Sequence, residues 1–60
     1  MSGPAKRKLK TIGDALFKSV SEAAGMRTAE VVSPVDVRVL AVSVQTIADE
    51  LWKLAEELED

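Results

Sequence analysis

Apolar residues recur along the N-terminal half of the chain at helical spacing. These positions, three or four residues apart, are Leu9, Ile12, Leu16, Val20 and Ala23. Residues at such steps lie on one side of an α-helix, so the pattern predicts an amphipathic helix over residues 5–24. Gly25 follows the last apolar position closely, and a glycine at this place is a common helix stop because it has no Cβ to clash.

A second and more regular apolar pattern runs through the C-terminal half. Its aliphatic residues are Val37, Leu40, Val44, Ile47, Leu51, Leu54 and Leu58. They fill the a and d positions of three consecutive heptads, which is the repeat of a coiled coil. Ser33 is a good N-cap because its hydroxyl can accept a backbone N–H, and Pro34 needs no N–H at the first helical position. The sequence therefore predicts a helix from Pro34 to Glu59.

Residues 35–44 also fit a β-strand. Val35-Asp36-Val37-Arg38-Val39 alternates between apolar and charged residues and is rich in β-branched side chains. This alternative gives a helix, a β-hairpin turning at Ser33-Pro34, and a second helix. Leu40-Ala41 interrupts the alternation while the heptad phase continues, and both features favour the long helix.

Residues 35–46, VDVRVLAVSVQT, resemble the second strand of gas-vesicle shell proteins, which are built as helix, hairpin and helix. The segment from Gly25 to Arg38 is too short for the first strand and turn of that family. We therefore assign no family. A self-assembling shell subunit stays as an alternative function that requires strands in this region.

The preferred fold class is all-α, an antiparallel helical hairpin that forms one domain over residues 1–60. It comprises a shorter helix, a loop of about nine residues and the longer heptad-patterned helix, with residues 1–5 flexible. The antiparallel arrangement places the basic start of the first helix beside the acidic end of the second. We expect these opposite charges to offset each other there, because each cluster is unfavourable for the dipole of its own helix.

The chain is too small to cover its own apolar residues. It has 60 residues, 47% of them hydrophobic, and contains neither Cys nor His, so no disulfide or thiolate or imidazole metal site can reinforce the core. We therefore expect a homo-oligomer, such as a homodimer forming a coiled-coil-like bundle, or docking on a protein partner. The predicted interface residues are Val37, Leu40, Val44, Ile47, Leu51, Trp52, Leu54 and Leu58.

A basic cluster near the N-terminus suggests an alternative function. It consists of Lys6, Arg7, Lys8 and Lys10, half of the 8 basic residues in the chain. Such a cluster could contact the phosphates of nucleic acid in a small regulatory protein, or another anion. Aromatic residues are only 3% of the chain and none lies near the cluster, so a base-stacking platform is lacking.

The sequence offers no chemistry for catalysis. No phosphate-binding loop, dinucleotide fingerprint or metal-ligand spacing occurs, and no serine has a histidine to activate it. We expect no enzyme activity, no catalytic or metal residues and no cofactor. The longest apolar-biased stretch, residues 31–44, is interrupted by charges and shorter than a membrane-spanning helix, and no apolar signal segment follows Lys10. We therefore expect no transmembrane segment and a cytoplasmic protein.

Overall fold

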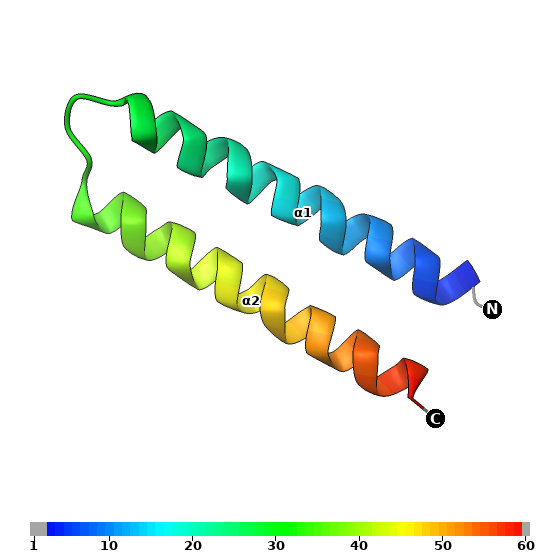
Figure 1. Ribbon diagram of the computed structural model, residues 1–60. Helices are drawn as coiled ribbons and strands as arrows, with labels where there is room; N and C mark the ends of the chain where they lie inside the picture. Colours follow the sequence, from blue (N-terminus) through cyan, green and yellow to red (C-terminus); the bar gives the residue numbers. More distant parts are fainter. Residues whose placement is uncertain (1–2, 60) are drawn as a thin grey trace.

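The computed structural model describes residues 3–59, and these form two antiparallel helices. Helix α1 spans Gly3–Thr28 and α2 spans Pro34–Leu58. The helices lie side by side, with the connecting loop at one end of the hairpin and both chain ends at the other (Figure 1). The predicted all-α hairpin is confirmed. The β-hairpin alternative is wrong, because residues 3–59 contain no strand and residues 35–44 are helical.

Helix α2 begins where the local sequence places it. Ser33 has an extended backbone (φ −80°, ψ 132°), and its Oγ accepts a hydrogen bond from the Val35 N–H at 3.2 Å. Pro34 occupies the first turn, and Asp36 places a negative charge at the positive end of the helix dipole. The predicted N-terminal cap is therefore confirmed, and it decides residues 35–44 in favour of helix.

Replacing Ser33 by alanine should remove this cap. We expect Ser33→Ala to lower the free energy of unfolding by about 1 kcal/mol, because one backbone N–H of the first turn loses its acceptor. Ser33→Asp, which keeps an acceptor, should retain most of the stability. Urea denaturation followed by circular dichroism at one fixed protein concentration measures both variants, and equal stability of the two would contradict a capping role.

Helix α1 extends beyond both predicted ends. Gly25 does not stop it, since no glycine among the described residues has a positive φ. The helix continues to Thr28, whose Oγ donates to the Gly25 carbonyl at 3.1 Å, and the Ala29 N–H then bonds the Met26 carbonyl at 3.3 Å. The extra turn brings Met26 into a half-buried position. Burial of this side chain offsets the cost of a glycine inside the helix, about 1 kcal/mol relative to alanine.

Two smaller expectations change accordingly. The loop is residues 29–33, shorter than the predicted nine residues, and the two helices are nearly equal in length, at 26 and 25 residues. Residues 3–5 belong to α1 rather than to a flexible end. The prediction of flexibility at Met1 and Ser2 lies outside the described residues.

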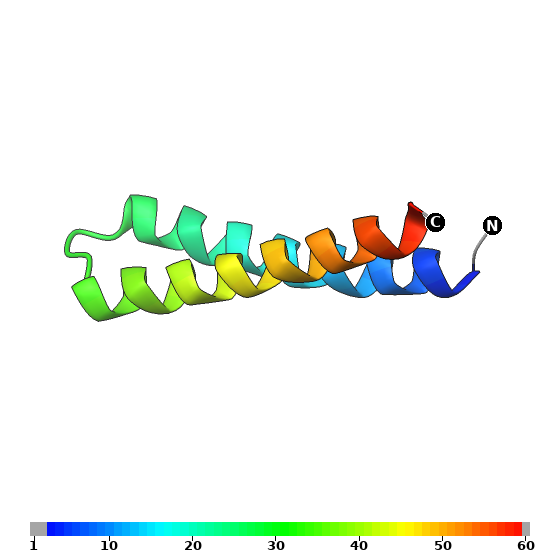
Figure 2. The same ribbon diagram turned by 90° about the horizontal axis from the view of Figure 1, so that it is seen from below.

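The contact between the helices repeats every seven residues. Inward-facing positions, buried or half-buried, recur at steps of seven: Ala5, Ile12, Ser19 and Met26 on α1, and the N-cap Ser33 followed by Leu40, Ile47 and Leu54 on α2. Ala23 and Ser43 are also half-buried, between these steps. Ile12, Ile47 and Leu54 form the buried core, with Ala5 packed against it. A seven-residue contact repeat on both helices is typical of coiled-coil packing. The helices cross gently, so that α2 passes from one side of α1 to the other along the hairpin (Figure 2).

Candidate self-association surface

The hairpin interior covers only one of the two apolar positions in each heptad. Ile47 and Leu54 are buried against α1, and Leu40 is half-buried. The alternate positions on α2 remain exposed: Val37, Val44, Leu51 and Leu58. On α1, Leu9, Leu16 and Val20 are also exposed. The structure thus divides the predicted interface residues of α2 into an inner row, which contacts α1, and an outer row, which faces solvent.

The exposed rows of the two helices lie on the same side of the hairpin. Leu9 and Leu16 each follow an inward residue of α1 by four positions, and Val44 and Leu51 do the same on α2. Four residues advance about 40° beyond a full turn. Because the helices are antiparallel and equally handed, this advance turns both rows toward one side. We call this side the apolar flank: Leu9, Leu16, Val20, Val37, Val44, Leu51 and Leu58.

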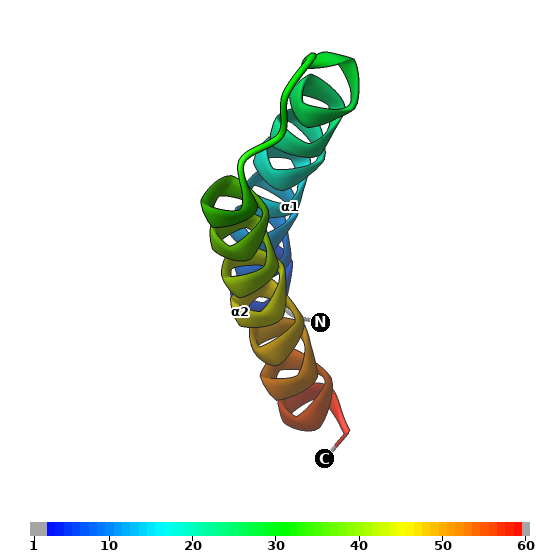
Figure 3. The same cartoon turned by 90° about the vertical axis from the view of Figure 1, so that its left-hand side faces the viewer.

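The two large aromatic residues mark the margins of the apolar flank. Phe17 and Trp52 are 72% and 70% exposed, and each follows an inward residue, Ile12 or Ile47, by five positions. Five residues advance about 140° beyond a full turn, so both rings lie at the outer edge of this side. Viewed from the loop end, the helices form a single layer, and no other element in residues 3–59 covers the flank (Figure 3).

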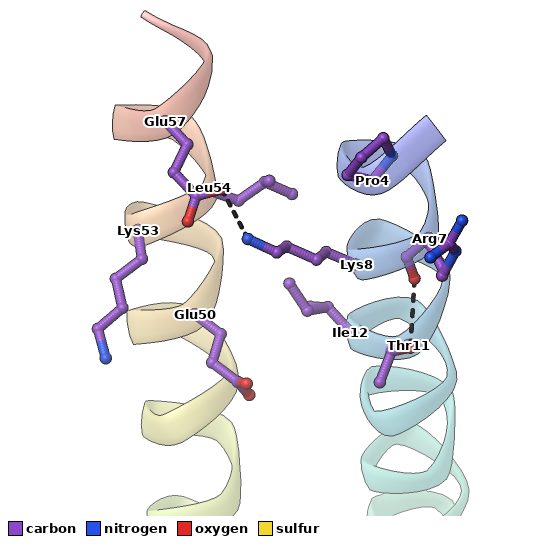
Figure 4. Close-up of a pocket in the computed structure, with 9 residues that line it drawn as sticks. All are labelled: Pro4, Arg7, Lys8, Thr11, Ile12, Glu50, Lys53, Leu54 and Glu57. Atoms are coloured by element: carbon purple, nitrogen blue, oxygen red, sulfur yellow. Dashed lines mark hydrogen bonds and ion pairs between the residues drawn. The ribbon is translucent and has the colours of Figure 1, made fainter. Parts of the chain in front are cut away.

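The opposite side of the hairpin is polar near the chain ends. A groove there is lined by residues that include Lys8, Glu50 and Lys53 together with Ile12 and Leu54 (Figure 4). Lys8 Nζ lies 2.8 Å from Glu57 Oε1 and bridges α1 to α2. The expected juxtaposition of the basic start and the acidic end is therefore confirmed.

This ion pair contributes little to stability. Both side chains are more than half exposed, 55% for Lys8 and 54% for Glu57. A double-mutant cycle with Lys8→Ala and Glu57→Ala should give a coupling energy below about 1 kcal/mol, because water and salt screen the charges. Urea denaturation of the four proteins measures the coupling. A value of several kcal/mol would contradict a solvent-screened pair.

The basic cluster does not form one patch. Lys8 is turned toward Glu57, whereas Lys10 pairs with Asp14 on its own helix at 3.1 Å. Arg7 is exposed and lines the same groove as Lys8, whereas Lys6 is exposed on another side of α1. Two of the four cations are thus already engaged with carboxylates, and the geometry adds no support to the nucleic-acid alternative.

A second exposed apolar region lies at the loop end. It consists of valines, which we call the valine patch: Val31, Val32, Val35, Val39 and Val42. Val35 and Val42 precede the inward residues Leu40 and Ile47 by five positions, so they turn away from the apolar flank. Val31, Val32 and Val39 line a shallow groove beside Met26. The valine patch is therefore separate from the apolar flank.

Comparisons with known proteins give no match, so any inference about function rests on the surfaces of the hairpin itself. No family model, curated protein or solved structure matches the chain. Neither helix in residues 3–59 is long and apolar enough to cross a membrane. Within the same residues, no three carboxylates are grouped so that they could hold a metal ion.

Proposed function

We propose that the protein is a non-catalytic self-association module in which the apolar flank is the contact surface between copies. The role is structural: the two helices form a rigid support, and the apolar flank binds the second copy. The outer row of α2 and the matching row of α1 supply a stripe of aliphatic side chains, with Lys6 and Arg27 on the same side only near the two ends of α1. A docking protein with a complementary apolar helix is the alternative occupant.

The observation that carries this proposal is the surface area of the single chain. A compact monomer of 6.5 kDa exposes about 3,800 Å², whereas this hairpin exposes 5014 Å². Its radius of gyration is likewise large, 14.3 Å against about 10 Å for a compact chain of this length. The excess, about 1,200 Å², is more than the roughly 800 Å² that each partner contributes to a standard protein interface. Pairing through the flank can therefore bring the chain to ordinary compactness.

The small core supports the same proposal. Among residues 3–59, only Ile12, Ile47 and Leu54 are buried apolar residues, and none of them is fully buried. Burial of such a side chain contributes about 1.5–3 kcal/mol, and a single core in a chain this short rarely supplies more than about 3–5 kcal/mol in total. A second copy that covers Leu51 and Val44 adds burial of the same kind.

Thermal unfolding at different protein concentrations tests the proposal. Association stabilises the folded state by mass action, so the midpoint should rise as the concentration increases from about 5 to 500 μM. The far-ultraviolet circular dichroism signal of the helices reports the midpoint. A midpoint that is the same at all concentrations would show that folding does not depend on a second copy.

A further inference from the structure

We propose that two hairpins pair through their apolar flanks with both loops at the same end, giving a four-helix bundle in which each α1 lies against α2 of the other copy. This inference rests on the proposed function and adds the partner and its orientation. A second copy is a suitable partner because the excess surface, about 1,200 Å², is sufficient for one side of a standard dimer interface, roughly 800 Å². Each copy also presents the same seven-residue repeat to the other.

The levels of the exposed side chains make the flank self-complementary. Leu9 and Leu16 on α1, and Val44 and Leu51 on α2, recur at the same seven-residue interval, so the exposed rows of the two helices have the same repeat along the hairpin. A two-fold axis parallel to the helices keeps every level in place. Each layer of one hairpin then meets the identical layer of the other, as in an up-down bundle. Pairing with the loops at opposite ends also aligns the layers, so packing alone does not choose between the two orientations.

Charge decides the orientation at the open end of the hairpin. Lys6 and Lys10 lie on α1 at this end, one and five positions after the inward residue Ala5, and Glu59 caps the end of α2, five positions after Leu54. At 100° per residue, all three turn toward the flank side of the hairpin. When the loops are together, each basic start of α1 has an acidic α2 end on both sides, one from its own chain and one from the second copy. Complementary potentials across an interface favour one orientation over others. The first such contact already exists within the chain between Lys8 and Glu57.

Pairing with the loops at opposite ends loses this arrangement. Each α1 then faces α1 of the other copy, head to tail, and Lys6 comes level with Arg27. Both residues follow an inward residue, Ala5 or Met26, by one position, as Val20 follows Ser19, so they lie on the flank side of α1 near its two ends. The same-end arrangement also brings Arg27 toward the second copy's Arg38, so it carries one like-charge approach near the loop.

The same-end arrangement has a functional consequence. Both ends of each chain lie opposite the loop (Figure 1), so a same-end dimer gathers all four chain ends on one side. The two valine patches then lie at the loop end of the bundle, one on each outer face. The assembly therefore has the four chain ends at one end and two equivalent apolar surfaces at the other.

Distance measurements between spin labels test the orientation. The chain contains no cysteine, so Glu30→Cys gives a single label in the loop, and Gln45→Cys gives one near the middle of α2. Double electron–electron resonance should give a Glu30→Cys distance below about 30 Å, the width of two helix layers about 10 Å apart plus the label arms. The Gln45→Cys label should also give a short distance in either orientation.

The two labels separate the possible failures. A short distance at position 45 with a distance near the 47 Å length of the hairpin at position 30 would overturn the same-end arrangement while keeping self-association. Absence of any dipolar signal from both labels, with full helicity, would overturn the proposed function itself. Short distances at both positions support the same-end bundle.

Discussion

Val44→Glu should dissociate the assembly into single chains. Val44 is 43% exposed in the hairpin and lies near the middle of α2, in the apolar flank. In a dimer the second copy covers this position, and an unpaired carboxylate there costs several kcal/mol because nothing replaces its hydration. The substitution occurs in both copies. We expect the dissociation constant to rise at least 1,000-fold, corresponding to about 4 kcal/mol, as measured by sedimentation velocity over a concentration series.

Val42→Glu is the matched control. It makes the same substitution two positions earlier on the same helix, at a residue that is 62% exposed and belongs to the valine patch. Two residues correspond to about 200° of rotation, so the new charge points away from the flank and stays in water. Val42→Glu should leave the dissociation constant unchanged within about threefold. If the two variants dissociate equally, the flank is wrongly assigned.

Ile47→Ala should unfold much of the chain. Ile47 is one of the three buried apolar residues and packs with Ile12 and Leu54. Truncating a buried isoleucine typically costs about 2–5 kcal/mol through lost burial and the cavity left behind. This loss is comparable with the whole stability of so small a core. Urea denaturation at one fixed concentration should show a large fall in the midpoint and reduced helicity without denaturant.

The control for the core is an exposed valine on the same helix. Val39 is exposed in the valine patch, so Val39→Ala should change the free energy of unfolding by no more than about 0.5 kcal/mol. Alanine also favours the helix, and its effect on propensity is similar at both sites. The seven-residue contact repeat would be refuted as the source of stability if Ile47→Ala were as mild as Val39→Ala.

Local signals in the sequence were sufficient to predict α2 but not the end of α1. Ser33 and Pro34 act within one turn, through a cap and a missing N–H, so their effect can be predicted from neighbouring residues alone. Gly25 is different, because glycine permits both a helix and a helix stop. The outcome depends on Met26 packing toward α2, a tertiary contact that the local pattern does not contain.

The heptad pattern predicts which apolar residues of α2 lie on one side of the helix. It does not predict which of them contact α1 and which stay exposed. The heptad repeat alone predicts that all seven aliphatic positions of α2 belong to one interface. A hairpin has only one neighbouring helix for α2, which covers Leu40, Ile47 and Leu54 and leaves Val44 and Leu51 outside. The division depends on the direction from which α1 approaches. That direction is set by the antiparallel register and by the inward positions of α1, including Ser19, which the apolar pattern omitted.

The most direct test of self-association is the mass of the unmodified chain in solution. Sedimentation equilibrium at about 10–100 μM should give at least twice the 6.5 kDa of one chain, with the fully helical spectrum of the hairpin. A stable, fully helical species of 6.5 kDa throughout this range would contradict the account, because the apolar flank would then remain uncovered without cost.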